Sequence, residues 1–327
     1  MTKENAILSD IIAHMKYAKY MPELRRRETW EELIQRNADM HIKKYPHMKD
    51  RITQIYKEYV LPKRVLPSMR SLQFAGKAIE VNNSRIFNCA YLPIDDMHAF
   101  SETMFLLLSG TGVGYSIQDS DISKLPTIKH PKDRHRKYVI QDSIMGWADA
   151  IKTLMKSYMG KTSSKIVFDF DEIREKGAIL VTAGGKAPGP APLKICLAKI
   201  EEILSSKKDG ELLTSIEIHD ILCHIADSVL SGGIRRSAMI SFFDINDTNM
   251  ALCKSGEWWD KNSQRGRANN SVILDRSEVT KDIFNDLWTK TKNSRAGEPG
   301  FYFTNNKKWG ANPCVEIGLR PKQFCNL

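Results

Sequence analysis

The pattern of hydrophobic and polar residues predicts a helical start to the chain. Thr29 can cap a helix, two glutamates follow it in the first turn, and spaced apolar positions continue to about Met40. A second helix is predicted over residues 50–59, ending before Pro62. We therefore expect residues 1–60 to form an N-terminal helical segment.

Beyond residue 60 the pattern alternates between short apolar runs and helical periodicity. This alternation predicts an α/β architecture with a largely parallel sheet. Residues 119–182 combine a basic run, Lys129–Lys137, with a helix, and we interpret them as an insertion. The predicted helices cover residues 99–108, 142–159, 192–206 and 215–230, and the predicted strands cover residues 85–92, 239–243 and 269–274.

Composition describes an ordinary globular protein of 327 residues, with 42% apolar and 27% charged residues. No apolar run approaches the roughly 20 residues that span a bilayer, and the N-terminus lacks the pattern of a signal peptide. We therefore expect a cytoplasmic protein without a membrane partner. The net charge of +10 could attract nucleotide phosphates. Because no nucleic-acid-binding motif is present, we expect no nucleic acid partner.

The six cysteines do not form a metal-binding pattern. No Cys-x-x-Cys pair and no Cys/His cluster with zinc spacing occurs, so we expect no metal site. Cys196 and Cys223 lie in apolar helical contexts and are predicted to be buried, inert thiols. In a reducing compartment a disulfide is usually catalytic or transient.

The segment Asn312-Pro313-Cys314-Val315-Glu316 is the strongest candidate for chemistry. If it is extended, alternate side chains share one face, which places an amide, a thiol and a carboxyl side by side. A lone Cys-x-Glu pattern is usually structural. A second thiol at Cys325 and a third at Cys89, on a predicted strand, strengthen the functional interpretation.

Each of three glycine-containing segments can be interpreted in two ways. Gly110-x-Gly112-x-Gly114 follows a helix and precedes a strand, which is the reverse of the dinucleotide-binding order. Its glycines allow either a close helix-to-strand passage, as simple turn chemistry, or backbone contact with a ligand. The loop at residues 184–190 is either a rigid connector or a nucleotide-responsive segment. Arg235-Arg236, after paired glycines, either contact phosphate or form surface ion pairs.

From about Arg27 to Leu327 the chain resembles the catalytic subunit of ribonucleotide reductase. The resemblance is strongest to the adenosylcobalamin-dependent ribonucleoside-triphosphate reductases and their viral relatives. Seven motifs carry it, in this order: Leu66-Pro67-Ser68-Met69-Arg70, Phe87-Asn88-Cys89, Ser109-Gly110-Thr111-Gly112-Val113-Gly114, residues 184–190, residues 231–238, Ala268-Asn269-Asn270-Ser271, and Asn312 to Ile317 with Cys325-Asn326-Leu327.

The resemblance implies a role for each candidate residue. Cys314 would hold the thiyl radical that abstracts the ribose 3′-hydrogen, and Glu316 would accept the 3′-hydroxyl proton as general base. Asn312 would orient the substrate hydroxyls. Cys89 and Cys325 would supply two electrons and close into a disulfide as the 2′-hydroxyl leaves as water. The resemblance also implies a second set of residues, which would bind the substrate: Ser68, Asn88 and Gly112.

The implied fold is a ten-stranded α/β barrel with the radical cysteine on a loop at its centre. Residues 61–327 would form the first, incomplete part of this barrel. The inserted residues 119–182 would be the allosteric specificity region, where a deoxynucleotide effector binds. We expect the effector contacts within residues 119–190 and assign none of them to single residues.

The radical itself must come from outside the side chains. The resemblance implies adenosylcobalamin, and the alternative is a separate metal-containing radical subunit. The other expected partners are a ribonucleotide, a thioredoxin-like reductant and a second polypeptide that carries the rest of the barrel. Relatives continue past Leu327, so the isolated chain is expected to be inactive. A further alternative is a nucleotide-binding fragment without chemistry. Whether a diphosphate or a triphosphate is reduced stays open.

Overall fold

The computed structural model describes residues 2–160, 164–180, 186–230 and 238–326. Its contacts divide the chain into two compact units. The first contains residues up to Asn88 together with Asn326, and the second is Cys89–Cys325. Residues 61–88, which we expected to begin the barrel, thus belong to the first unit. The predicted loop glycines at 184–185 and the paired arginines at 235–236 fall outside the described residues.

The first unit is helical, as predicted for its first 60 residues. Helix α2 begins after a capping box: the Glu32 amide donates to the Thr29 hydroxyl at 3.3 Å, and the Thr29 amide donates to the Glu32 carboxylate at 2.8 Å. The predicted helix is confirmed and ends at Lys44. The elements are α1 (Lys3–Lys16), β1 (Tyr20–Met21), β2 (Arg26–Arg27), α2 (Trp30–Lys44), α3 (Lys49–Ile55), α4 (Met69–Phe74) and α5 (Lys77–Val81), with a π-helical turn at Tyr56–Val60.

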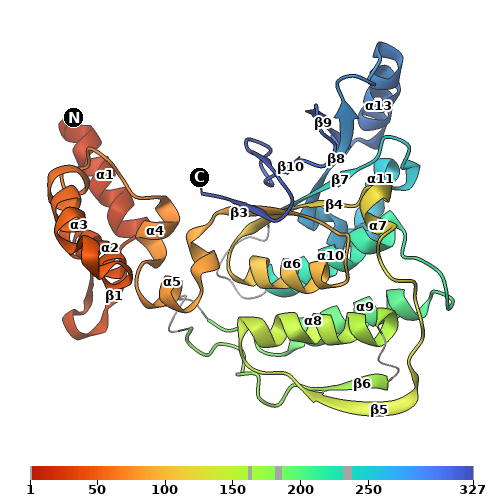
Figure 1. Ribbon diagram of the computed structural model, residues 1–327, viewed down its shortest axis with the longest axis horizontal. Helices are drawn as coiled ribbons and strands as arrows, with labels where there is room; N and C mark the ends of the chain where they lie inside the picture. Colours follow the sequence, from red (N-terminus) through yellow and green to blue (C-terminus); the bar gives the residue numbers. More distant parts are fainter. Residues whose placement is uncertain (1, 161–163, 181–185, 231–237, 327) are drawn as a thin grey trace. The chain divides into compact units, whose positions relative to one another are not determined.

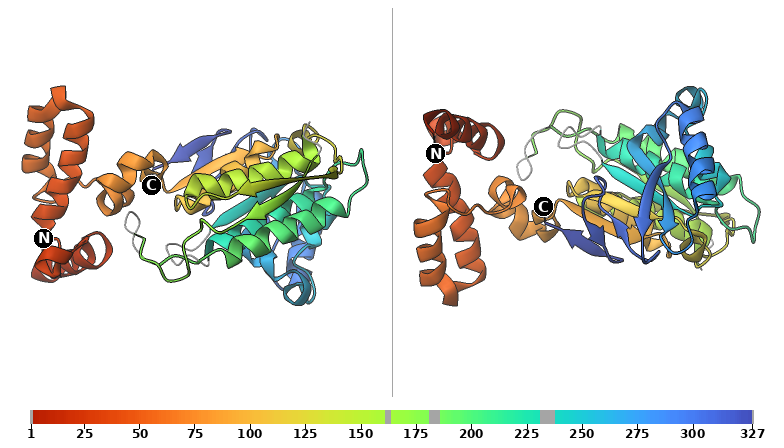
Figure 2. Two further views of the ribbon diagram at one scale, coloured as in Figure 1. Left: turned by 90° about the horizontal axis from the view of Figure 1, so that it is seen from below. Right: turned by 90° about the horizontal axis from the view of Figure 1, so that it is seen from above.

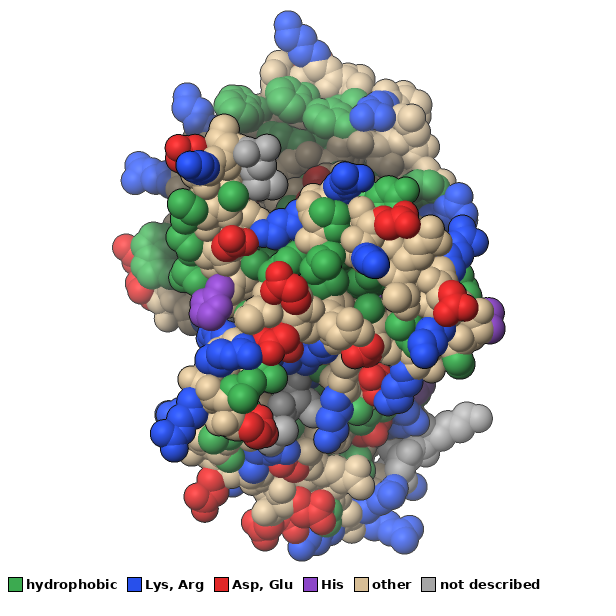
Figure 3. Space-filling model, turned by 90° about the vertical axis from the view of Figure 1, so that its left-hand side faces the viewer, with side chains coloured by type: hydrophobic (Ala, Val, Ile, Leu, Met, Phe, Trp, Pro, Cys, Tyr) green, Lys and Arg blue, Asp and Glu red, His purple; other side chains and the backbone are tan. Residues whose placement is uncertain are grey.

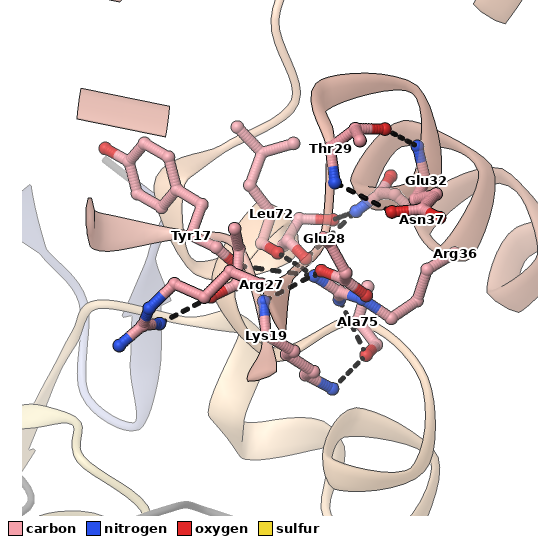
Figure 4. A network of polar contacts seen from close by, with 12 residues as sticks. Tyr17, Lys19, Arg27, Glu28, Thr29, Glu32, Arg36, Asn37, Leu72 and Ala75 are labelled. Atoms are coloured by element: carbon pink, nitrogen blue, oxygen red, sulfur yellow. Dashed lines mark hydrogen bonds and ion pairs between the residues drawn. The ribbon is translucent and has the colours of Figure 1, made fainter. Parts of the chain in front are cut away.

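A buried ion pair ties the helices of this unit together (Figure 4). Glu28 accepts two hydrogen bonds from the Arg36 guanidinium, at 2.7 and 2.9 Å. The same guanidinium also donates hydrogen bonds to the backbone carbonyls of Leu72 and Ala75. Burial, and then the charge of Arg36, lowers the pKa of neighbouring Lys19 to about 8. The pair thus connects the segment before α2 to α2 itself and to α4.

Part of the surface of the first unit is apolar. Helix α1 leaves Ile7, Leu8 and Met15 more than half exposed. Figure 3 shows hydrophobic side chains among lysines, arginines and acidic residues on the side of the molecule that lies at the left of Figure 1.

No helix in the described part of the chain is both long enough and apolar enough to cross a membrane.

The second unit is built on a six-stranded sheet with the order β12-β3-β4-β7-β8-β9. Strands β3, β4, β7, β8 and β9 run parallel, and β12 pairs antiparallel with β3 (Figure 1). The predicted α/β architecture with a largely parallel sheet is confirmed. The strands are β3 (Cys89–Pro93), β4 (Gly112–Ser116), β7 (Met239–Phe243), β8 (Ala268–Asp275), β9 (Gly300–Thr304) and β12 (Gln323–Cys325).

The predicted strand at 85–92 begins later than expected. Residues 83–86 form a 3₁₀ turn, in which the Asn82 side chain accepts a hydrogen bond from the Ser84 amide at 3.0 Å. An asparagine that caps the backbone in this way competes with strand formation. Strand β3 therefore starts at Cys89, which places this cysteine at the first position of the strand.

One face of the sheet is covered by helices (Figures 1 and 2). Helices α6 and α10 lie against the sheet, α8 and α9 pack on these two helices, and the β5–β6 pair lies beyond α8. The predicted helices are confirmed within two residues at each end. The remaining elements here are α6 (His98–Leu108), α7 (Asp119–Ile122), β5 (Lys132–Val139), α8 (Ile144–Met159), β6 (Ser164–Asp169), α9 (Ala191–Ser205), α10 (Ser215–Leu230), α11 (Thr248–Leu252), α12 (Trp258–Asn262) and α13 (Lys281–Ser294).

The basic run at residues 129–137 contains a strand that was not predicted from the sequence. Most of it belongs to β5, which pairs in parallel with β6. The strand is held by an inward-facing apolar pair, Tyr138 and Phe168, whose rings meet edge to face at 5.9 Å. Charged side chains at most other positions hid this strand from the hydrophobic pattern.

A polar group is enclosed between the sheet and α10. The Tyr115 hydroxyl, on β4, is hydrogen-bonded to Nδ1 of His219 at 2.7 Å, and Nε2 of His219 lies 3.7 Å from the Cys223 sulfur. All three side chains are fully buried. Burial lowers the pKa of His219 to about 3, so the imidazole stays neutral and can accept from the tyrosine.

The low pKa of His219 makes the stability of the fold depend on pH. The unfolded imidazole binds a proton below pH 6.5, whereas the folded one stays neutral until about pH 3. Stability is therefore fully present above pH 6.5 and is lost as the pH falls. We expect this group to remove about 2 kcal/mol between pH 6.5 and 5. Urea unfolding of wild type and His219→Gln at both pH values checks this, because glutamine keeps an acceptor without titrating. Equal pH dependence in both proteins would contradict it.

Candidate active site

The candidate residues of the C-terminal segment lie in a tight hairpin. Strand β10 (Gly310–Ala311) pairs antiparallel with β11 (Gly318–Leu319), and residues 312–317 form the loop. The Val315 amide donates to the Asn312 carbonyl at 2.9 Å, which closes a four-residue turn. The extended arrangement that we predicted for Asn312, Cys314 and Glu316 is therefore wrong. Asn-Pro is typical of the first two positions of a turn, and this preference outweighs strand formation here.

The loop contains a strained residue next to Cys314. Val315 has a φ of 66°, in the left-handed region that β-branched residues rarely adopt. Such a conformation persists only where surrounding contacts hold it, and it is found most often at functional sites.

Glycines on β4 allow the hairpin to lie directly on the sheet, on the face opposite the helices (Figure 1). A Cβ atom on Gly114 would lie 1.9 Å from the Ala311 carbonyl oxygen, and one on Gly112 would lie 3.0 Å from the Pro313 ring. Gly310 of β10 passes over Tyr91 of the neighbouring strand β3. A Cβ atom on Gly310 would lie 2.1 Å from the Tyr91 ring. Gly112 and Gly114 thus accommodate the chain's own hairpin, a close approach that neither interpretation of this glycine motif had named.

A row of aromatic side chains lies between the hairpin and the sheet, on the sheet face opposite the helices. The rings of Tyr91 and Phe242 meet edge to face at 6.1 Å, and those of Phe242 and Tyr302 lie 4.9 Å apart. Tyr302, on β9, donates its hydroxyl to the Gly310 carbonyl at 3.0 Å. Burial raises the pKa of Tyr302, so the phenol stays protonated and remains a donor. Sequence reasoning missed Tyr91 and Tyr302, because only the pairing of distant strands brings them to the hairpin.

Two of the three candidate thiols face each other across neighbouring strands. Cys89 on β3 and Cys325 on β12 are direct partners in the antiparallel pairing, and both are buried. Directly opposite residues have Cα atoms about 4.5–5.5 Å apart, within the range that a disulfide spans. Asn312 joins this pair to the hairpin, because its side-chain amide donates to the Cys89 sulfur at 3.7 Å. The structure thus brings together Cys89, Cys325 and Asn312.

Cys314 and Glu316 are placed differently from this buried group. Both are exposed on the loop that Asn312 opens. Within the described residues no hydrogen bond or ion pair engages the Cys314 thiol or the Glu316 carboxylate. Both groups are thus accessible to a ligand.

The three expected substrate-binding residues belong to different units. Ser68 caps α4 by accepting a hydrogen bond from the Ser71 amide at 3.2 Å, and Asn88 is buried in the same unit. Gly112 lies in the second unit, beneath the Pro313 ring. Their joint role in substrate binding stays a prediction.

The remaining cysteines lie on the helix-covered side of the sheet. Cys196, Cys223 and Cys253 are buried there, which confirms the prediction for the first two. Burial raises the pKa of Cys196 and of Cys253 to about 12, and that of Cys223 well above its usual range. These thiols stay protonated and unreactive. The candidate thiols Cys89, Cys314 and Cys325 are not part of this buried group.

The site as a whole suits a two-electron redox reaction. Two facing thiols can donate two electrons by closing into a disulfide. An exposed thiol and an exposed carboxylate on a short loop offer a reactive sulfur and a proton acceptor nearby. The loop is fixed to the sheet by Gly114 and Tyr302, so these groups are held on a rigid base.

Comparisons with known proteins agree with this chemistry. Residues 116–204 match the family model of the insertion domain of B12-dependent ribonucleotide reductase. An adenosylcobalamin-dependent ribonucleoside-triphosphate reductase of Euglena gracilis is 30% identical over 77% of this chain and 36% of its own length. A putative one of Mycobacterium phage D29 is 27% identical over 97% of this chain and 54% of its own. One of Lactobacillus delbrueckii is 25% identical, over 95% and 52%.

The fold comparison gives the same result. The crystal structure of a B12-dependent (class II) ribonucleotide reductase superposes with a TM-score of 0.80 at 22% identity, over 95% of this chain and 53% of that chain. The chain thus spans about half the length of most of these relatives. The six-stranded sheet of the described residues is the counterpart of part of that fold. Residues 116–204 thus match the B12-dependent ribonucleotide reductase insertion domain, and the chain as a whole is similar in sequence and fold to adenosylcobalamin-dependent ribonucleotide reductases.

Proposed function

We propose that this chain is the catalytic chain of a ribonucleotide reductase and reduces the ribose 2′-hydroxyl of ribonucleotides for DNA synthesis. One observation carries the proposal: Cys89 and Cys325 are direct partners across two strands, and Asn312 connects them to the loop that holds Cys314. A buried thiol pair beside a rigidly seated reactive thiol suits a reaction that needs one radical and two electrons.

The side chains divide the reaction between them. Cys314 removes the 3′-hydrogen atom from the ribose and later returns one. Glu316 accepts the 3′-hydroxyl proton, which helps the 2′-hydroxyl to leave as water. Cys89 and Cys325 lose two electrons and two protons and form a disulfide. A thioredoxin-like dithiol then reduces this disulfide again. We place this cycle in the reducing cytoplasm, where a disulfide is usually catalytic or transient.

Adenosylcobalamin is the radical source that we propose. The named relatives depend on it, which favours it over a separate metal-containing subunit. The exposed thiol of Cys314, beside the 40% exposed Val315, fits the approach of a large group. When bound, the cofactor supplies one-electron chemistry that ordinary side chains lack.

A second polypeptide that carries the rest of the fold is also part of the proposal. An apolar groove of about 480 Å³ beside the edge strand β12 offers it a seat. Its lining residues include Phe105 of α6, Met145 of α8 and Phe324 of β12, together with the charged Lys322 and Glu102. An apolar sheet face in an α/β protein is normally covered by a helix.

We propose that residues 119–190 bind a deoxynucleotide effector.

A single-turnover experiment tests the proposed function. The chain is combined with the polypeptide that supplies the remaining half, adenosylcobalamin and a ribonucleoside triphosphate, without any external dithiol. Formation of deoxynucleotide should stop at about one per chain, with a matching amount of Cys89–Cys325 disulfide found by peptide mapping. Replacing Cys196, a buried thiol on the helix side, by alanine should leave this yield unchanged. Deoxynucleotide formed without that disulfide would overturn the proposal.

A further inference from the structure

Asn312 is completely buried and uses every polar group that it has. Its side-chain oxygen accepts from the Ile317 amide at 3.1 Å, and its carbonyl accepts from the Val315 amide at 2.9 Å. Its backbone amide donates to the Ile317 carbonyl at 3.4 Å. These three contacts close the loop that carries Cys314. The side-chain nitrogen donates in the other direction, to the Cys89 sulfur at 3.7 Å.

We infer that Asn312 is a positioning residue that couples the redox state of Cys89 to the conformation of the loop holding Cys314. The inference rests on the proposed function, because it assigns to this site a link between its two sulfur groups. One side chain holds the loop with its oxygen and contacts the thiol with its nitrogen, so a change at the sulfur reaches the loop directly.

Disulfide formation changes the contact that Asn312 makes. Each of the two thiols gives up a proton, together they give two electrons to the oxidant, and a sulfur–sulfur bond of about 2.05 Å forms. The Cys89 sulfur must then point towards Cys325 on the neighbouring strand. A buried amide N–H that loses its acceptor is unfavourable, so the Asn312 side chain must reorient.

Reorientation of the side chain also withdraws its oxygen from the Ile317 amide. The loop then loses one of its closing contacts, while Val315, with its φ of 66°, is already in an unfavourable conformation. We therefore expect the loop to change shape when the disulfide forms. In the oxidised chain Cys314 is displaced from its working position until the thiols are restored, which prevents a radical from forming without available electrons.

Alkylation of Cys314 by iodoacetamide measures this coupling in the isolated chain. One sample is fully reduced and desalted, and a second is oxidised by glutathione disulfide, which becomes two glutathione thiols as the Cys89–Cys325 bond forms. Chains that carry glutathione on Cys314 are identified by mass and left out of the comparison. We expect the Cys314 rates of the two samples to differ by at least about fivefold. In Asn312→Ala the two rates should be equal. Asn270→Ala is the matched control, because it removes an amide–thiol contact elsewhere, of 3.0 Å to Cys253, and should keep the difference.

Two further observations separate the possible failures. In Cys325→Ser the Cys89–Cys325 disulfide cannot form, so the oxidant should leave the alkylation rate of Cys314 at the value of the reduced chain. This variant tests the coupling even if Asn312→Ala does not fold. If the disulfide forms but the rates stay equal in the wild-type chain, the coupling is wrong and the proposed function stands. If the difference persists in Asn312→Ala, the coupling runs through other residues and the inference is overturned. If the disulfide never forms, both proposals fail.

Discussion

Replacing Cys314 by serine is expected to abolish nucleotide reduction in the complemented enzyme, with a loss of at least about 10³-fold, or about 4 kcal/mol of activation free energy. An O–H bond is much stronger than an S–H bond, so serine cannot form the radical that removes the 3′-hydrogen. Because the Cys314 side chain is exposed and no described residue bonds to it, the free energy of unfolding should change by less than about 0.5 kcal/mol. The measurement is the conversion of labelled ribonucleoside triphosphate, beside a urea titration.

Effector binding provides the control for this variant. Cys314→Ser should bind a deoxynucleotide as tightly as the wild-type chain, because the exchange alters one exposed atom. Loss of both activity and effector binding would indicate general damage. Undiminished reduction by Cys314→Ser would remove the radical assignment, although the fold of the chain and its similarity to these reductases would stand.

Elements with strong local signals could be predicted from the sequence. The capping box at Thr29 and Glu32 marks the start of α2 in the residues themselves, and the apolar run Met239–Phe243 coincides with β7. Helices α9 and α10 follow from the spacing of their apolar positions. In each case the same few neighbouring residues both carry the signal and form the structure.

Signals that compete locally gave the errors. Asn312 to Glu316 has the alternation of a strand, but Asn-Pro begins a turn, and the turn is the lower-energy choice at the end of a two-residue strand. In β5 the charged residues mask a strand whose stability comes from pairing with β6 and from the Tyr138–Phe168 contact. Tertiary pairing of this kind has no signature in the strand's own sequence.

The candidate site was predictable in its chemistry and not in its geometry. The thiols, the amide and the carboxyl could be selected from motif order. The direct pairing of Cys89 with Cys325 depends on strand register, and the contact between Asn312 and Cys89 joins residues 223 positions apart. The supporting residues Tyr91 and Tyr302 lie on β3 and β9, which are separated by three other strands of the sheet. Only the folded sheet brings both of them to the hairpin.

Gly114→Ala is expected to have the second largest effect, because it puts an atom where the hairpin backbone already lies. The new Cβ would be 1.9 Å from the Ala311 oxygen, and that neighbour is backbone and cannot rotate away. We expect a loss of about 1–3 kcal/mol in the free energy of unfolding. The hairpin must move off β4, which displaces the loop of Cys314, and a displacement of about 1 Å can lower activity about 100-fold.

Hydrogen exchange distinguishes displacement of the hairpin from general loosening of the fold. In Gly114→Ala the amides of residues 310–319 should exchange faster, because the bond from Tyr302 to Gly310 weakens, while those of α9 and α10 keep their protection. Gly266→Ala is the matched control: its Cβ would meet only the Trp258 ring, at an ordinary contact of 3.5 Å. If Gly114→Ala retained full activity and normal exchange at 310–319, the hairpin could not rest on β4, and Asn312 would have no fixed position from which to reach Cys89.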